Sequence, residues 1–324
     1  MSVRRVTVRK AVTWALLAVL VLPLVLGVAA WLVFYTMLSA FAPDRTNGRL
    51  VSGGEEREYL LHVPKSYDAT RPAPLVVSLH GAMNWPAFQS EVSGWNALAD
   101  EKGFLVVYPA GEGLGPKTWF MAGARRPASM PDVVFIADLL AKLQAEYRID
   151  PARIYVNGLS NGGGMAFVLS CTLSDRIAAI GAVAAAQSLP WTWCKDERPI
   201  PMIAFHGTAD SIVPYNGGKV AIAPQPFPSV PDWAAHWARR NGCKARSESA
   251  PARDVTRLEY TGCAEQASVV LCTLEGAGHQ WFGGRAMPEW MVGPMSNRVH
   301  ATRAMWDFFS RHRLPDRTAV AVGH

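Results

Sequence analysis

The chain has few charged residues for its 324-residue length, at 18 %, and its formal net charge is only +6. Four of the positive charges belong to Arg4, Arg5, Arg9 and Lys10, so the rest of the chain is nearly balanced. No aromatic residues alternate with runs of Lys and Arg, as they would on a surface that stacks bases. The composition therefore excludes a basic nucleic-acid-binding face.

Signatures of metal and cofactor binding are also missing. No cluster of His, Cys and acidic residues has metal-ligand spacing, and no glycine-rich phosphate loop is present. We therefore expect chemistry that needs neither a metal nor a cofactor.

Charge is completely absent from Ala11 to Ala42. A membrane-spanning helix needs about 20 apolar residues, whereas the core of a signal peptide needs only about 7 to 15, so the length favours a transmembrane anchor. Ala40-Phe41-Ala42 has the small-x-small form of a cleavage site, which keeps a long cleaved signal open, and Pro43 argues against cleavage. The basic residues 1–10 are expected to stay in the cytoplasm. Both interpretations place the remaining chain outside the cytoplasm, either membrane-anchored in a lipid bilayer or secreted.

Strand and helix patterns alternate along the rest of the chain. We expect a polar tether over residues 43–57, one catalytic domain over 58–314 and a flexible tail over 315–324. Short β-branched or aromatic runs predict strands at 59–63, 75–79, 104–108, 154–156, 178–183, 202–205 and 269–274, and apolar spacing predicts helices at 94–102, 132–147, 231–240 and 297–311. Asp132 and Asp232 fit N-cap positions of two of these helices. Such alternation predicts an α/β fold with a mostly parallel sheet and helices on both faces.

A candidate nucleophile follows the strand at 154–156. Ser160 lies in Gly158-Leu159-Ser160-Asn161-Gly162, and an apolar helix start comes next. In a nucleophile elbow this tight turn lifts the serine hydroxyl above a parallel sheet, and the glycines keep side chains out of the bend. The motif alone arises by chance in about one chain in ten of this length, so its weight depends on partners downstream.

Two such partners follow later strands in the order that this fold requires. A serine needs an imidazole to take its proton and a carboxylate to orient that imidazole. Asp210 comes just after the strand at 202–205, and His279 lies in a glycine-containing loop just after the strand at 269–274. We therefore expect Ser160, Asp210 and His279 to form a catalytic triad. Asp232 and Asp254 are weaker candidates for the acid.

The tetrahedral oxyanion also needs donors, which are usually backbone N–H groups. We expect one from Asn161 and the other from Ala82, with Gly81 as the alternative to Ala82. His80 is expected to orient the site rather than to react. Candidate walls of the substrate pocket are Trp119 and Trp281, on loops at the same edge of the sheet, together with His80.

Five cysteines lie in the exported part of the chain, where disulfides are favoured. Sequence cannot fix their pairing, but Cys171 with Cys194 and Cys243 with Cys263 are economical pairs. They leave Cys272 as a buried thiol in its apolar strand.

Taken together, these motifs resemble the polyhydroxybutyrate depolymerase-like and feruloyl esterase-like branch of the α/β-hydrolases. The resemblance extends from Glu58 to Gly284 and includes the motifs around His80, Ser160, Asp210 and His279 and the segment 103–109. It implies hydrolysis of carboxylic esters through an acyl-serine, on polyhydroxyalkanoate oligomers, feruloylated or acetylated polysaccharides, or small aryl esters. Phe282 departs from the proline that relatives commonly carry after the tryptophan.

The sequence thus predicts an exported serine esterase whose partner is a small or oligomeric ester. Since no polymer-binding segment follows residue 314, soluble esters are favoured over solid polymer. Two alternatives stay open: an acyltransferase that uses the same triad, and a non-catalytic cell-surface binding module that keeps the fold.

Overall fold

The computed structural model describes residues 21–33, 45–113, 115–120, 130–185, 194, 198–220 and 226–315. The chain divides into two units, residues 1–44 and 45–324. In the first unit, residues 21–33 form a helix inside the predicted segment 11–42, whose other residues lie outside the described ranges. None of the helices formed by described residues combines the length and the apolar character needed to cross a bilayer. The membrane anchor over 11–42 stays a prediction.

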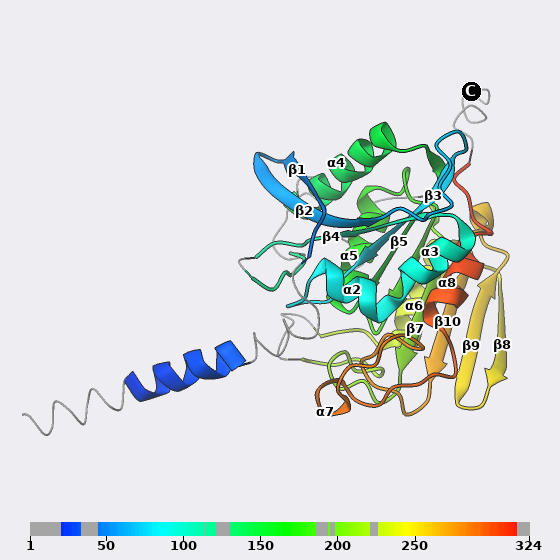
Figure 1. Ribbon diagram of the computed structural model, residues 1–324. Helices are drawn as coiled ribbons and strands as arrows, with labels where there is room; N and C mark the ends of the chain where they lie inside the picture. Colours follow the sequence, from blue (N-terminus) through cyan, green and yellow to red (C-terminus); the bar gives the residue numbers. More distant parts are fainter. Residues whose placement is uncertain are drawn as a thin grey trace, which may run out of the picture. The chain divides into compact units, whose positions relative to one another are not determined.

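A ten-stranded sheet forms the centre of the second unit (Figure 1). Its spatial order is β1-β2-β4-β3-β5-β6-β7-β10-β9-β8. The six strands from β4 to β10 pair in parallel, and one antiparallel strand pair borders them on each side. The strands are β1 (Gly48–Ser52), β2 (Glu55–His62), β3 (Ala73–Leu79), β4 (Leu105–Pro109), β5 (Ile149–Leu159), β6 (Ala179–Val183), β7 (Met202–Gly207), β8 (Ala245–Ala252), β9 (Val255–Thr261) and β10 (Val269–Leu274).

The central strands are apolar along their whole length because helices cover both faces of the sheet. All residues of β4, β6 and β7 are buried. One face carries α4 (Pro131–Glu146), α5 (Asn161–Thr172) and α6 (Val230–Arg240). The other carries α2 (Pro86–Ser93), α3 (Trp95–Lys102) and α8 (Ala301–Phe309), and the short α7 (Glu289–Val292) lies in the loop before α8. The predicted mostly parallel α/β sheet with two helical layers is confirmed.

The sheet begins earlier than the sequence predicts. Strand β1 and the first residues of β2 lie in segment 43–57, which we expected to be a tether. These strands contain no apolar run, because their side chains alternate between exposed and partly buried positions at the edge of the sheet. The folded domain therefore begins before residue 58. The tail beyond residue 315 lies outside the described residues.

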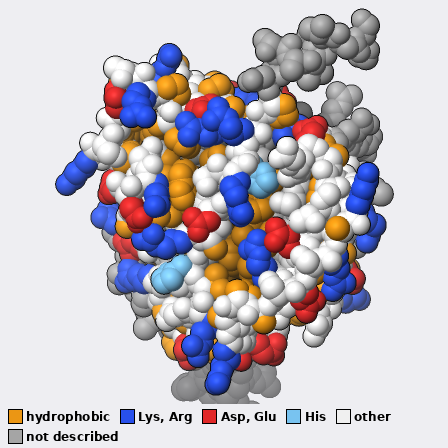
Figure 2. All heavy atoms as spheres, turned by 90° about the vertical axis from the view of Figure 1, so that its right-hand side faces the viewer, with side chains coloured by type: hydrophobic (Ala, Val, Ile, Leu, Met, Phe, Trp, Pro, Cys, Tyr) orange, Lys and Arg blue, Asp and Glu red, His pale blue; other side chains and the backbone are white. Residues whose placement is uncertain are grey.

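A second edge, the hairpin of β8 and β9, was not predicted at all. Seven of the eight residues of β8 are exposed, so this strand has no apolar face to reveal it. Ion pairs run along the two strands, Arg246 to Glu248 at 3.4 Å and Arg257 to Glu259 at 3.2 Å. Figure 2 shows this side of the molecule, where basic and acidic side chains are interspersed. Such charged edges oppose pairing with further strands.

Helix α6 begins differently from the prediction. Its N-cap is Ser229, whose Oγ accepts a hydrogen bond from the backbone N–H of Asp232 at 3.2 Å. Ser229 Oγ in turn donates to the Asp232 carboxylate at 2.6 Å. Asp232 is thus the third residue of the helix, bonded to the cap, and not the cap itself.

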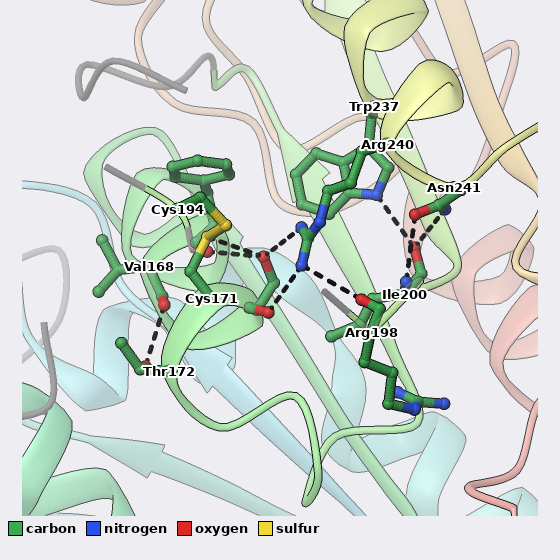
Figure 3. Close-up of a disulfide and its surroundings, with 11 residues drawn as sticks. Val168, Cys171, Thr172, Cys194, Arg198, Ile200, Trp237, Arg240 and Asn241 are labelled. Carbon is green, nitrogen blue, oxygen red and sulfur yellow. Dashed lines mark hydrogen bonds between the residues drawn. A yellow bond between two sulfur atoms is a disulfide. The ribbon is translucent and has the colours of Figure 1, made fainter. Parts of the chain in front are cut away.

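Two disulfides join the predicted pairs, Cys171 with Cys194 and Cys243 with Cys263, and Cys272 is free and buried. Figure 3 shows the first bridge at the end of α5. Beside it, the Arg240 guanidinium of α6 donates to the hydroxyl and carbonyl oxygens of Ser170 at 3.1 and 3.0 Å. The bridge and the arginine together hold the end of the helix that follows Ser160. Both predicted disulfides are confirmed.

Candidate active site

Ser160 occupies a one-residue turn between β5 and α5. Its backbone has φ 53° and ψ −118°, a conformation that costs a non-glycine residue energy and is found at functional turns. Two backbone hydrogen bonds hold the turn: Ser160 N–H donates to the Val183 carbonyl at 2.9 Å, and the Ser160 carbonyl accepts from Gly164 N–H at 3.1 Å. This strand, strained turn and helix have the form of a nucleophile elbow.

The glycines around Ser160 are required by close backbone approach. A Cβ on Gly158 would lie 2.2 Å from the Gly162 carbonyl carbon, and one on Gly162 would lie 2.4 Å from the Leu79 oxygen. At Gly163 an added Cβ would meet the Ala185 methyl at 2.4 Å. Because real Cβ atoms do not approach this closely, any larger residue would push α5 away from the ends of β3, β5 and β6.

The loops that follow successive parallel strands meet at one edge of the sheet. At this edge, formed by the carboxyl ends of the parallel strands, a backbone hydrogen bond joins each strand end or its loop to that of the neighbouring strand. These bonds are Ser160 N–H to Val183 O, Ala184 N–H to Phe205 O, and Ala209 N–H to Ala277 O, each 2.9 Å long. The nucleophile turn therefore shares its sheet edge with the loops that carry Asp210 and His279.

Asp210 is buried at the end of β7, and four donors surround its carboxylate. Oδ1 accepts the backbone N–H groups of Ile212 and Val213 at 2.9 and 2.8 Å. Oδ2 lies 2.7 Å from Nδ1 of His279 and 3.3 Å from Nε2 of His206. Burial opposes ionisation, but the hydrogen bonds from His206 and His279 prevail and hold the pKa of Asp210 well below its usual range. The carboxylate is ionised at neutral pH.

His279 lies in the loop after β10, only 5 % exposed. Its Nδ1 donates to Asp210, so its Nε2 is left as the basic nitrogen. The backbone fixes the loop: His279 N–H donates to the Val292 carbonyl at 2.5 Å, and a Cβ on Gly278 would lie 2.3 Å from the same oxygen. Gly207 packs as tightly against the Ala277 carbonyl, so the acid and base loops are in direct contact.

The residues predicted as oxyanion donors are Asn161, which follows Ser160 directly, and Ala82, which follows Gly81. Asn161 starts α5, and its side chain forms two hydrogen bonds to the backbone of Trp119, accepting from N–H at 2.8 Å and donating to the carbonyl at 3.2 Å. A Cβ on Gly81 would lie 3.7 Å from Ser160 Cβ, so the loop that carries Ala82 adjoins the nucleophile. The roles of the Asn161 and Ala82 N–H groups as oxyanion donors stay predictions.

His80 is fully buried beneath this loop, with both ring nitrogens bound. Nδ1 donates to the Gly81 carbonyl at 2.7 Å, and Nε2 accepts the Gly111 N–H at 3.0 Å. Burial lowers the pKa of His80 to about 4, so the ring is neutral. Its ring packs against Trp119 with centroids 5.0 Å apart. His80 therefore holds the backbone of Gly81 and Gly111, and its role as an orienting residue of the site stays a prediction.

The two predicted pocket tryptophans are also covered by protein. Trp281 has no exposed surface, and its indole N–H donates to Thr302 Oγ1 at 2.8 Å. Trp119 is 1 % exposed and donates its indole N–H to the His80 carbonyl. These rings pack behind the site instead of lining an open wall. The exposed large apolar residues on the loops that carry His80, Trp119 and Trp281 are Met83, Phe120, Trp290 and Met291.

A buried ion pair that sequence reasoning missed holds the loop before residue 121. Asp132 binds Arg57 at 2.5 Å and accepts the backbone N–H of Phe120 at 2.9 Å. The Arg57 guanidinium also donates to the Ala110 carbonyl and lies 4.2 Å from the centre of the Phe135 ring. The prediction that Asp132 is the N-cap of this helix is therefore wrong; the N-cap residue of α4 is Met130. Arg57 lies in the charged run from Glu55 to Glu58, so the sequence carries no clear signal for this pair.

Metal ligands do not gather in this region. Within the described ranges, no group of three or more His, Cys, Asp and Glu side chains is arranged to hold an ion. The arrangement that is present, a carboxylate bonded to an imidazole at the edge that carries a strained serine, suits acyl transfer.

Comparisons with known proteins agree with this geometry. Residues 57–187 match the family model described as Esterase PHB depolymerase. The chain is 30 % identical over 258 residues to the putative esterase NocK of Nocardia uniformis subsp. tsuyamanensis, covering 74 % of each chain. It is 29 % identical over 267 residues to feruloyl esterase B of Piromyces equi, covering 80 % of this chain and 46 % of that protein. The chain thus spans about half the length of that esterase.

Solved structures share the fold. The acetyl xylan esterase from Aspergillus awamori superposes with a TM-score of 0.58 at 15 % identity, over 81 % of this chain and 98 % of that one. A thermostable esterase gives a TM-score of 0.54 at 16 % identity, over 85 % of this chain and 64 % of that one. At these identities the likeness shows a common fold.

Proposed function

The chain belongs to the Esterase PHB depolymerase family, and from this premise we propose that it is an exported carboxylic-ester hydrolase that acts through an acyl-serine. One observation carries the proposal: His279 Nδ1 binds the buried Asp210 carboxylate at 2.7 Å, on the sheet edge where Ser160 occupies its strained turn. An imidazole held in this way has the tautomer needed to accept a proton at Nε2.

In the first half of the reaction, Ser160 Oγ attacks the ester carbonyl while His279 Nε2 takes the hydroxyl proton. The backbone N–H groups of Asn161 and Ala82 stabilise the oxyanion that forms. Asp210 stays ionised and stabilises the imidazolium. When the tetrahedral intermediate collapses, His279 gives the proton to the departing alcohol, and the acyl group stays on Ser160.

In the second half, water attacks the acyl-serine with His279 as the general base. Collapse of this second intermediate returns the proton to Ser160 Oγ and releases the acid.

We assign small or soluble esters as substrates, of the feruloyl, acetyl or hydroxyalkanoate type. The relatives named as feruloyl and acetyl xylan esterases support this choice. Phe120 follows Trp119 and is 59 % exposed, and Met83 follows Ala82 and is 46 % exposed. These apolar side chains suit contact with the acyl or alcohol part of an ester.

Export is supported by the two disulfides, because such bonds persist in oxidising compartments. The uncharged segment 11–42 would direct the chain to the membrane, as an anchor or as a cleaved signal. N-terminal sequencing of the exported protein distinguishes these two forms: an intact N-terminus supports the anchor, and a new one after Ala42 supports cleavage.

The activity is tested with the full-length protein on p-nitrophenyl acetate and methyl ferulate. We expect wild type and the control Ser247→Ala, an exposed site on β8, to hydrolyse at least one ester at equal rates, and Ser160→Ala to lose the activity. Equal rates for wild type and Ser160→Ala would contradict the proposal. Adding an acceptor alcohol and analysing the products separates hydrolysis from acyl transfer.

A further inference from the structure

His206 is the last side chain of β7 before the acid loop, and it is 1 % exposed. Its Nε2 lies 2.8 Å from the carbonyl oxygen of Val213 and 3.3 Å from Oδ2 of Asp210. A carbonyl oxygen can only accept, so the hydrogen is on Nε2. The same N–H therefore faces both the Val213 carbonyl and the carboxylate that holds His279.

This 3.3 Å contact, together with the hydrogen bonds of the turn, closes a ring of polar contacts around Asp210. Val213 donates its N–H to Oδ1 and accepts from His206 with its carbonyl, so the peptide and the imidazole hold the loop from two sides. Oδ2 then has two imidazole donors, from His279 and from His206. With His206 absent, Oδ2 would keep a single donor, and the carboxylate would be freer to rotate away from His279.

The ring of His206 is itself fixed. It packs beside Tyr215 with ring centroids 6.1 Å apart. The Tyr215 hydroxyl bonds to Thr273 Oγ1 at 2.9 Å, and Thr273 is the register partner of His206 on the adjacent strand β10. His206 is thus held between the strands that precede the acid and the base, which gives its N–H a defined direction.

We infer that His206 is a positioning residue of the triad: its Nε2–H is the second donor to Asp210 Oδ2 and keeps that oxygen directed at His279. The inference rests on the proposed esterase function. His206 is buried against Val213, Asp210 and Tyr215, so we expect it to act on the rate of the chemical step and not on substrate binding. If His206 served only to hold the turn, its hydrogen bond to the Val213 carbonyl would be sufficient.

The test compares two substitutions at this position in the full-length protein. His206→Leu removes the donor, whereas His206→Gln offers an amide N–H at a similar reach. For p-nitrophenyl acetate we expect kcat to fall about 10- to 100-fold in the Leu variant with KM within about twofold, because small misplacements of catalytic groups have effects of this size. The Gln variant should recover most of the lost kcat.

The chain offers a matched control on its surface. His62 pairs with Asp100 at 3.0 Å on β2, and neither belongs to the site. His62→Leu should leave kcat and KM unchanged. Thermal unfolding midpoints of all variants show whether a loss of kcat follows a loss of folded protein.

A second readout does not depend on ester hydrolysis. The proton shared by His279 Nδ1 and Asp210 should give a far-downfield proton NMR resonance in wild type, move or vanish in His206→Leu, and return in His206→Gln. If wild type hydrolyses no ester, the proposed function fails while this resonance still tests His206. The inference is overturned if His206→Leu keeps the resonance and wild-type kcat, if Leu and Gln lose kcat equally, or if KM rises as kcat falls.

Discussion

His80 and His279 are both buried and both follow a parallel strand of the same sheet, but the protein binds their ring nitrogens differently. Both nitrogens of His80 are bound to backbone groups, those of Gly81 and Gly111. In His279 one nitrogen binds the Asp210 carboxylate, and among the described residues no hydrogen bond to Nε2 is recorded. A ring with both nitrogens bound supports a loop, whereas a ring with an open nitrogen and a carboxylate behind it can move a proton.

The largest expected effect comes from replacing His279, and the same kind of replacement at His80 is its comparison. His279→Ala should lower kcat by about 10⁶-fold, the scale on which loss of a triad base acts. His80→Gln should keep kcat within about tenfold, because His80 has no open nitrogen to lose. Steady-state rates on p-nitrophenyl acetate measure both, and comparable losses would show that the contrast between the two rings is unfounded.

Asp210→Asn tests the carboxylate, the partner that His279 has and His80 lacks. The amide can donate to His279 Nδ1, which would place the imidazole in the wrong tautomer, so kcat should fall about 10⁴-fold while the fold is kept. Asp232→Asn, in the first turn of α6, serves as the control and should match wild type. Full activity of Asp210→Asn would remove Asp210 from the mechanism.

Much of this site follows from the sequence because it depends on strand ends. Ser160, Asp210 and His279 each follow an apolar strand, and parallel strands bring their carboxyl ends to one edge. The disulfide pairs could be predicted in the same way, from short separations along the chain.

What could not be predicted depends on contacts across the fold. His206 looks like any core residue of β7 until the turn returns Asp210 and Val213 to its ring. The burial of Trp119 and Trp281 likewise results from partners on other segments, His80 and Thr302. Strand β8 carries no apolar pattern because almost all of it faces solvent.

The next largest effect is on the free energy of unfolding, and it comes from the His80 ring. Its ordinary pKa is 6.5, and burial lowers the pKa to about 4 in the folded protein. Between these pH values the imidazole is protonated in the unfolded chain but not in the native protein. The free energy of unfolding therefore falls as pH drops, by about 3 kcal/mol in total. Chemical denaturation at pH 7 and pH 4.5 should show a smaller decrease for His80→Gln.

That decrease should not vanish in the variant. Burial also lowers the pKa of His312 to about 4, so His312 adds a loss of the same sign. An identical pH dependence in wild type and His80→Gln would mean that the His80 ring is not excluded from protonation.

The smallest effect concerns the support around His80. Asn161→Ala keeps the backbone N–H but removes both side-chain bonds to Trp119, whose indole binds the His80 carbonyl. Two lost hydrogen bonds of ordinary strength correspond to about a tenfold fall in kcat/KM. Asn297→Ala, on the surface, is the matched control, and a fall as large as that of Asp210→Asn would place the Asn161 side chain in the chemistry.

The central claim, that Ser160 is a nucleophile activated by His279, is tested most directly by covalent labelling. Full-length protein is incubated with a fluorophosphonate probe, and the adduct is located by intact mass and peptide mapping. We predict one adduct on the peptide that carries Ser160 in wild type, none in Ser160→Ala, and much slower labelling in His279→Ala. An unlabelled wild type, or labelling that survives Ser160→Ala, would contradict the account.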